Sequence, residues 1–287
     1  MRGFIAIAAA LLIACGPPSR DGNLGGGDDD DDGNGGPGGD GQCPAGAELV
    51  YVIDQFSHRI SQFDPSTKTF VDLGQLPCQP RAGATPFSMS VDRTGTAWVL
   101  YSSGELFHVG LQGLGCTPTA WASPNNMLVF GMGFSTDAVG GGAESLFIGG
   151  GRSQTQASYT LARVDPATMA TTTIGQEPEL PEMTGNSNAE LWGFFPSATT
   201  PRVVQFDKTN GTFVKEFPLP QLAGTMTGYA FAHWGGDYWV FLLKNGESST
   251  TVYQVNGQTG AITSTTPAPG RTIVGAGVST CAPVVIM

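Results

Sequence analysis

Carboxylic acids are the side chains of this sequence best suited to catalysis. Two acids on either side of a glycosidic bond can cleave it, one as the proton donor and the other as base or nucleophile. The acids that could serve are Asp54, Asp92, Glu105, Glu190 and Asp237. Asp92 and Asp237 have the surroundings of turn residues, and none of the five lies in a catalytic motif. We therefore expect no catalytic residue, and a glycosidase-like, carbohydrate-active enzyme is the alternative function.

Other kinds of chemistry find even less support in the sequence. The pairs Gly131/Gly133 and Gly275/Gly277 lack the third glycine of a dinucleotide-binding loop, and there is no P-loop, HExxH or GxSxG motif. The histidines are His58, His108 and His233. They fall at unrelated positions, and no cysteine has the close spacing of a metal site. We expect neither a metal nor another cofactor.

The first residues have the pattern of a secretory signal. Arg2 precedes the apolar run Gly3 to Ala14, which is too short to cross a bilayer, since a crossing takes about 20 residues. Leu12-Ile13-Ala14-Cys15 resembles the lipobox of bacterial lipoproteins. That resemblance implies cleavage after residue 14 and a lipid anchor on Cys15. An ordinary signal peptide with an incidental cysteine is the alternative.

Residues 15–42 hold the lipidated cysteine and a Gly/Asp-rich linker. The segment has almost no apolar side chains, so we expect it to stay disordered. Its run Asp28 to Asp32 begins like an EF-hand loop, but Gly39 stands where that loop needs a bidentate glutamate. Gly16 after the lipobox, where an aspartate would resemble an inner-membrane retention signal, favours the outer membrane. Either of its faces, periplasmic or cell-surface, is compatible with the sequence.

The charge of the chain restricts its partners. The formal net charge is −11, and seven of the 24 acids lie in the linker, so residues 43–287 are mildly acidic. No cluster of Lys and Arg is present. Nucleic acid is therefore excluded as a partner, and so is direct binding to anionic lipid.

Residues 43–287 contain an internal repeat of four strands. One aromatic position recurs at Tyr51, Trp98, Phe147, Trp192 and Trp239. The spacings are 47, 49, 45 and 47 residues, and we expect these side chains to pack between neighbouring units. Pairs of small residues recur in step at Ser88/Ser90, Gly131/Gly133, Gly185/Ser187, Ala230/Ala232 and Gly275/Gly277. Turns beginning at Asp64, Asp165, Asp207 and Asn256 complete the pattern in four of the units.

The repeat resembles the blade of a β-propeller, which has four strands in about 40–50 residues. The resemblance implies an all-β, five-bladed propeller, with a β-sandwich as the alternative fold. The first unit lacks an inner strand and the segment Ile273 to Ser279 lacks a partner, so the C-terminal strand should complete the first blade. That closure brings Cys43 beside Cys281. Of the three pairings open to four cysteines, it predicts Cys43–Cys281 and Cys78–Cys116.

A ligand site should lie where loops converge at one mouth of the central channel. The residues we expect to line it are His58, Arg59, Arg152, Arg202 and Lys244. The predicted function is that of a non-catalytic binding or scaffold module, monomeric, anchored to the membrane by lipid and recognising a protein or a glycan.

The chain as a whole also resembles uncharacterised propeller-like lipoproteins of myxobacteria. The stretches that carry this resemblance are Pro86 to Asp92, Glu190 to Phe195 and Val274 to Cys281. The resemblance implies export and the propeller fold, and it implies no activity.

Overall fold

A computed structural model describes residues 43–285. The predicted signal peptide, the lipidated Cys15 and the linker lie outside the described residues. Within residues 43–285, the chain forms twenty β-strands in five four-stranded sheets, with short 3₁₀ turns at Pro124–Asn126 and Pro220–Leu222.

The sheets are the blades of a propeller, and their strands follow in order from the innermost to the outermost. Blade 1 comprises β20 (Ile273–Val278), β1 (Val50–Asp54), β2 (Arg59–Asp64) and β3 (Thr69–Gln75). Blade 2 comprises β4 (Pro86–Val91), β5 (Thr96–Tyr101), β6 (Leu106–Gly110) and β7 (Cys116–Pro118). Blade 3 comprises β8 (Val129–Thr136), β9 (Glu144–Gly151), β10 (Tyr159–Val164) and β11 (Thr171–Glu177). Blade 4 comprises β12 (Glu182–Gly185), β13 (Leu191–Phe195), β14 (Arg202–Phe206) and β15 (Phe213–Pro218). Blade 5 comprises β16 (Met226–Trp234), β17 (Asp237–Lys244), β18 (Thr251–Asn256) and β19 (Ile262–Pro267).

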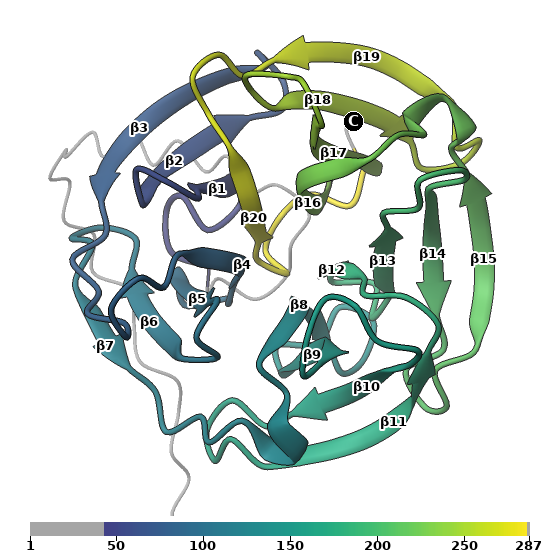
Figure 1. The fold of residues 1–287 in the computed structure, drawn as a ribbon. Coiled ribbons are helices and arrows are strands. Elements are labelled where there is room, and N and C mark those ends of the chain that lie inside the picture. Colours follow the sequence, from purple (N-terminus) through teal and green to yellow (C-terminus); the bar gives the residue numbers. More distant parts are fainter. Residues whose placement is uncertain (1–42, 286–287) are drawn as a thin grey trace, which may run out of the picture. The chain divides into compact units, whose positions relative to one another are not determined.

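The ring closes as the sequence predicted, because the last strand completes the first blade. β20 pairs antiparallel with β1, with Val278 opposite Val50 and Ile273 opposite Asp54. Figure 1 shows the five inner strands around a common centre, with the five outer strands at the rim. All strand pairs within the sheets are antiparallel, and the fold is the predicted all-β, five-bladed propeller.

The hydrophobic core lies between the blades and is divided into five clusters, one at each interface. The repeated aromatic residue of each second strand packs there, as expected. Trp98 of blade 2 meets Phe134 of blade 3 with ring centroids 5.5 Å apart, and Trp192 of blade 4 meets Tyr238 of blade 5 at 4.8 Å. Trp239 of blade 5 is 1% exposed within the cluster that joins blade 5 to blade 1. These aromatic residues therefore hold the blades together and leave no surface for stacking a sugar.

Small residues on the inner strands allow neighbouring strands to approach closely. A Cβ atom added to Gly133 of β8 would lie 2.7 Å from Thr184 of β12, and one added to Gly275 of β20 would lie 2.7 Å from the backbone of Met89 in β4. Both separations are shorter than real Cβ contacts, so a side chain at either position would push two blades apart. The steric constraint comes from the adjacent strand rather than from crowding at the ring axis.

The small-residue pattern is wrong in blade 4. Trp192 pairs with Thr184, and Phe194 pairs with Glu182, so Glu182 and Thr184 occupy the positions assigned to Gly185 and Ser187. In the other blades, the position of Glu182 is held by Ser88, Gly131, Ala230 and Gly275. Blade 4 thus carries a glutamate where every other blade has a small residue.

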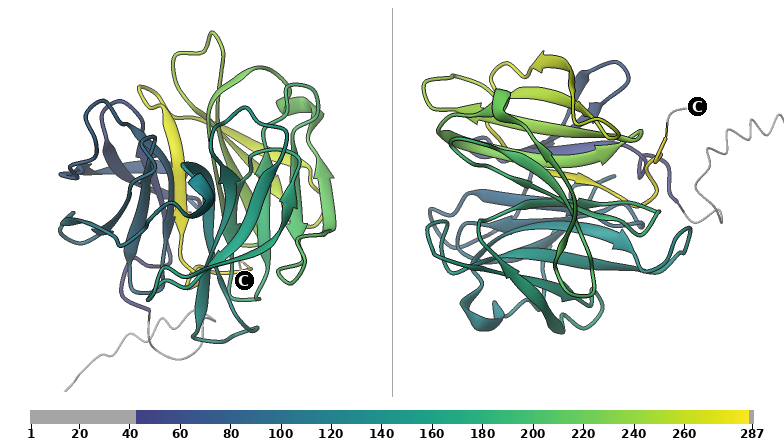
Figure 2. Two further views of the ribbon diagram at one scale, coloured as in Figure 1. Left: turned by 60° about the horizontal axis from the view of Figure 1, so that its bottom comes forward. Right: turned by 90° about the vertical axis from the view of Figure 1, so that its right-hand side faces the viewer.

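Both predicted disulfides are present. Cys43 and Cys281 are bonded with their Cα atoms 6.0 Å apart, and Cys78 is bonded to Cys116 with its Cα atom at 5.1 Å. Figure 2 shows the C-terminal end of the ring beside its first, purple residues. Disulfides persist in oxidising compartments, which points to an extracellular or periplasmic location. In residues 43–285, none of the helices has the length and apolar character needed to cross a membrane.

Replacing both Cys43 and Cys281 with alanine should lower the free energy of unfolding by about 5–6 kcal/mol, because the bridge closes a loop across 238 residues and so restricts the unfolded chain. The matched control replaces Cys78 and Cys116, which are 38 residues apart, and this change should lower the free energy of unfolding by about 1.6 kcal/mol less. Urea unfolding monitored by tryptophan fluorescence measures both losses. An equal or larger loss in the control pair would contradict the closing role of the Cys43–Cys281 bridge.

Candidate functional site at the channel mouth

The two faces of the ring differ in the loops they carry. We call the face on which the inner strands begin the start face, and the face on which they finish the end face. The turn between the first and second strands of blade 1, at Asp54 to Arg59, lies on the start face, because β1 runs opposite to β20. Cys43 and Cys281 lie on the end face, before β1 begins and after β20 finishes.

The inner strands are nearly free of ionisable groups. Among the residues of β4, β8, β12, β16 and β20, the titratable side chains are Glu182, Tyr229 and His233, and none is Lys or Arg. Burial lowers the pKa of His233 to about 4, so its imidazole is neutral near pH 7. The inner strands therefore supply no positive charge that could balance Glu182.

Glu182 is the first residue of β12 and is 2% exposed. Ser88 of β4, two blades away, donates a hydrogen bond from its Oγ to Oε2 of Glu182 at 2.9 Å. Burial raises the pKa of Glu182 well above its ordinary value, and the Ser88 hydrogen bond opposes that rise. Glu182 also helps to raise the pKa of Tyr229 on β16, after the larger effect of burial. Residues from three blades thus meet around this carboxyl group.

A cavity of about 50 Å³ contains Glu182 on the start face. It is lined by Gln55, Pro86, Phe87, Gln154, Glu182, Thr227, Gly228, Tyr229 and Val274. A groove of about 590 Å³, with walls from blades 3, 4 and 5, shares Gln154, Thr227 and Tyr229 with this cavity. The small cavity at the channel mouth is therefore continued outward by a larger groove.

Polar side chains deeper in the channel link one inner strand to the next. The Oγ of Ser90 in β4 accepts a hydrogen bond from the backbone N–H of Phe134 in β8 at 3.2 Å. The Oγ1 of Thr184 in β12 accepts one from the backbone N–H of His233 in β16 at 3.2 Å. These groups are engaged in holding strands together, whereas Glu182 faces a cavity.

The five residues expected to bind ligand all lie on the start face, but none lines the cavity or the groove. His58 lies edge-on to Tyr101, with the ring centroids 5.9 Å apart, and Arg59 begins β2 as an exposed residue. Arg152 is exposed at the end of β9, and Lys244 begins the turn after β17. Arg202 forms ion pairs with two glutamates of blade 4 and its neighbouring loop. Their role in binding stays a prediction.

The five acids considered for catalysis are divided between the two faces, and each of them accepts a hydrogen bond from a nearby residue. On the start face, Asp54 accepts a hydrogen bond from the backbone N–H of Thr272, and Glu105 accepts one from that of Arg81. On the end face, the acids bond side chains within their own blades. The indole N–H of Trp98 donates a hydrogen bond to Asp92. The side-chain amides of Asn186 and Gln254 donate to Glu190 and Asp237, respectively. The structure gives each of these acids a role in a turn or at a strand end.

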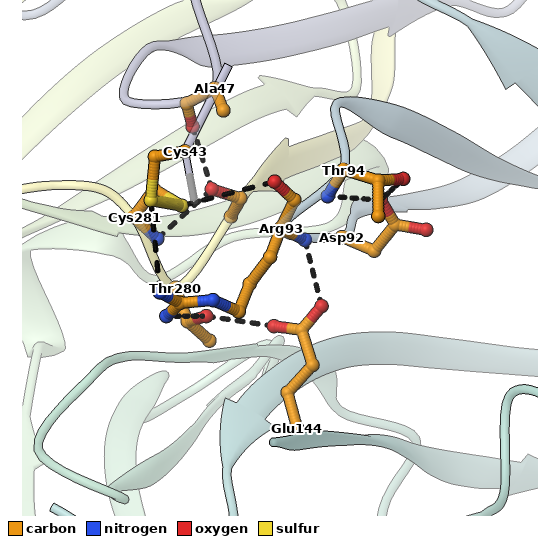
Figure 3. The surroundings of a disulfide bond; sticks show 9 residues. Cys43, Ala47, Asp92, Arg93, Thr94, Glu144, Thr280 and Cys281 are labelled. Carbon is orange, nitrogen blue, oxygen red and sulfur yellow. Dashed lines mark hydrogen bonds between the residues drawn. A yellow bond between two sulfur atoms is a disulfide. The ribbon is translucent and has the colours of Figure 1, made fainter. Parts of the chain in front are cut away.

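The end face carries a hydrogen-bonded cluster beside the closing disulfide (Figure 3). The backbone N–H of Arg93 donates to Oε1 of Glu144 at 2.7 Å, and its guanidinium donates to Oγ1 of Thr280 at 3.1 Å. Thr280 in turn donates to Oε2 of Glu144 at 2.7 Å. Burial raises the pKa of Glu144 to about 7, against the lowering effect of these bonds. The cluster joins blades 2 and 3 to the end of β20, which is a structural role.

Glu182 is the residue of this site that the sequence prediction missed. A signal for it was present, because the small residues stand eight and ten positions before the aromatic residue in blade 2, at Ser90 and Ser88 before Trp98. The same count back from Trp192 arrives at Thr184 and Glu182. The nearby Gly185 and Ser187 matched the small-residue pattern and hid the break.

Comparisons with known proteins leave the ligand open. No family model matches the sequence, and no curated protein matches it. Among solved structures, this chain is similar to regucalcin from Agrobacterium tumefaciens, which is described as a calcium-binding protein. The sequences are 12% identical and the TM-score is 0.47. The match covers 82% of this chain and 76% of the regucalcin chain. Hydrazine synthase from Kuenenia stuttgartiensis is 12% identical with a TM-score of 0.44, over 77% of this chain.

This chain spans 63% of the length of that hydrazine synthase chain. A chain of a mitotic checkpoint complex is 7% identical with a TM-score of 0.43, over 82% of this chain and 79% of its own length. At these TM-scores, the likenesses carry no argument about function. The propeller class rests on the sheet order and ring closure described above.

Stability should fall as the pH rises from about 5 to about 8. Burial raises the pKa of Glu144 and of Glu177 to about 7, and that of Glu182 well above the ordinary value. Above the ordinary pKa of about 4.5, each of these acids holds more protons in the folded chain than in the unfolded chain, so each makes the free energy of unfolding fall as the pH rises. His108 and His233, whose pKa values burial lowers, act in the opposite direction below about pH 6.5, and the three acids outweigh them. We expect a melting temperature at least about 3 °C higher at about pH 5 than at about pH 8.

The variants Glu144→Gln and Glu182→Gln should each flatten this pH dependence in a thermal melting series. A melting temperature that rises over the same interval in the unaltered protein would show that these acids are not buried as described. Aspartates with lowered pKa values, such as Asp72 and Asp207, lose their stabilising bonds only below about pH 4, outside the window.

Proposed function

We propose that this protein is an exported bacterial lipoprotein whose propeller is a non-catalytic binding module, with its ligand at the start-face mouth of the channel. The observation that carries the proposal is the groove of about 590 Å³ that adjoins the cavity at Glu182. Concave sites with a few converging polar groups are where proteins bind small molecules and short segments of partners. Gln154, Thr227 and Tyr229 provide hydrogen-bonding groups where the two spaces meet.

The proposal of a lipid anchor rests on the N-terminal sequence. It is supported by the apolar run up to Ala14 and by the lipobox-like residues ending at Cys15. The two disulfides agree with export, because the oxidising space outside the cytoplasm favours them. Gly16 supports delivery to the outer membrane.

A glycosidase-like activity is the second candidate, and one observation favours it. A buried acid with a raised pKa, such as Glu182, can act as a proton donor. The acid that lines the adjoining groove is Glu179, whose carboxylate is 3.5 Å from the guanidinium of Arg202. Glu182 and Glu179 line different spaces, so the two acids are not shown on either side of one opening, as cleavage of a glycosidic bond would require. Release of sugar from a glycan, abolished in Glu182→Gln, would replace the binding proposal with this one.

A substitution in the groove should abolish ligand capture. Thr227 is exposed where the groove meets the cavity, and arginine there would fill the opening. In a glycan array and a pull-down from envelope extract with the mature protein, Thr227→Arg should reduce capture at least about tenfold. The matched control is Gln258→Arg, at an exposed turn of the same blade on the end face. Equal capture by the two variants would place the ligand elsewhere and overturn the proposed site.

The lipid anchor can be tested separately. Cys15→Ala removes the thiol that would carry the diacylglycerol, so the protein should move from the membrane pellet to the soluble fraction on cell fractionation. Cys78→Ala serves as a control that also removes one cysteine but leaves the lipobox intact. Retention of the Cys15→Ala protein in membranes would refute lipidation.

A further inference from the structure

The cavity at Glu182 contains an acid without a basic partner. Neither the cavity nor the adjoining groove is lined by any Lys or Arg within residues 43–285. The nearest polar partner with a direct bond is the hydroxyl of Ser88. Burying a carboxyl group is costly unless a charge or several hydrogen bonds compensate for it. The four other blades avoid this cost with a small residue at the same position.

The size and charge of the cavity limit what can occupy it. About 50 Å³ accommodates roughly three to five water molecules. A small polar group at the end of a ligand therefore fits in the cavity, and a whole sugar ring does not. A single carboxyl group balances a single positive charge. In the part of the chain that the structure describes, no three side chains of the His, Cys, Asp and Glu types gather as a metal site would need. The adjoining groove has room for the body of a larger molecule.

We propose that this cavity binds the primary ammonium group of a polar ligand, with Glu182 as its counter-ion and the ligand body in the groove. The inference rests on the proposed binding function and adds the chemical class of the ligand. The amide oxygens of Gln55 and Gln154 and the hydroxyls of Thr227 and Tyr229 can accept the remaining ammonium hydrogen bonds. Phe87 and Tyr229 also line the cavity, and an aromatic ring attracts a cation placed over its face.

Binding of the ammonium releases one proton. In the empty cavity, burial favours the protonated Glu182, and the raised pKa of that group agrees with this. When the ammonium enters, the carboxylic acid gives its proton to solvent, and the resulting carboxylate pairs with the intact ammonium. The proton lost by Glu182 is thus the only covalent change, and the amine keeps all three of its hydrogens.

Affinity should therefore rise with pH until the amine itself loses its proton. Other titratable groups near β12 do not reverse this trend. His233 on β16 is neutral, Tyr229 on β16 has a raised pKa, and Glu144 lies at the opposite, end-face end of β9. Glu179 and Tyr159 face the groove rather than the small cavity.

The test compares amines with neutral counterparts of the same shape. Methylammonium and glucosamine are titrated into the mature protein beside methanol and glucose, and binding is followed by the melting temperature and by calorimetry in two buffers of different ionisation enthalpy. We expect both amines to stabilise the protein, the neutral compounds to have no effect, and calorimetry to report release of about one proton. Affinity for methylammonium, which stays fully protonated over this range, should rise at least about fivefold from pH 6 to pH 8.

Two variants of matched charge identify the group responsible. Glu182→Gln keeps the shape and the Ser88 hydrogen bond, so it should fold and lose amine binding at least about tenfold. Glu216→Gln removes an exposed acid on β15, the outer strand of the same blade, and should bind methylammonium as the unaltered protein does. Equal binding by Glu182→Gln, equal binding of methanol, or binding of Ca²⁺ alone to Glu182 with no response to amines would each overturn the inference.

These outcomes are separable from failure of the binding function itself. If a captured ligand is lost in Thr227→Arg but kept in Glu182→Gln, the groove binds its ligand and the ammonium inference is wrong. If Thr227→Arg also has no effect, the proposed site is wrong and the ammonium inference is overturned with it.

Discussion

The pairing of β20 with β1 is the contact on which the ring depends. Five sheets that pack face to face make a closed circle only if the last meets the first, and in this protein one sheet contains strands from both ends of the domain. The aromatic residues between the blades, including Trp239 beside blade 1, can all be buried only in that closed state. The Cys43–Cys281 bridge holds the same two ends together covalently. The ring therefore closes and its core becomes buried together, through pairing of residues more than 200 positions apart in the sequence.

Closure also determines where a binding site can exist. The inner strands pack so closely that four blades have small side chains where they meet, and the channel offers little space of its own. Glu182 departs from this rule at the opening, where its carboxyl group is buried but still faces a cavity. A buried acid at the mouth of the channel, beside a cavity, is the feature that led us to propose a ligand site there.

The fold could be predicted because the repeat shows in the residue types themselves. Tyr51 and Trp98 mark equivalent strands, and the unpaired halves at the two ends indicated closure and one disulfide. The residues predicted to bind ligand lie on the start face, which also carries the cavity, but they do not line it. The charged loop residues His58 and Arg152 were chosen for their chemistry, yet the cavity is lined by Gln55 and Gln154 from the same loops. Loop direction is set by local hydrogen bonds, which residue types do not reveal.

The position of the two ends gives the ring an orientation. Cys43 joins the domain on the end face, where the disulfide fixes it to Cys281, while Glu182 opens on the opposite side. Any chain preceding residue 43 is therefore attached at the pole remote from the opening. A molecule that enters the mouth of the channel therefore approaches the ring from the side opposite the disulfide that closes it.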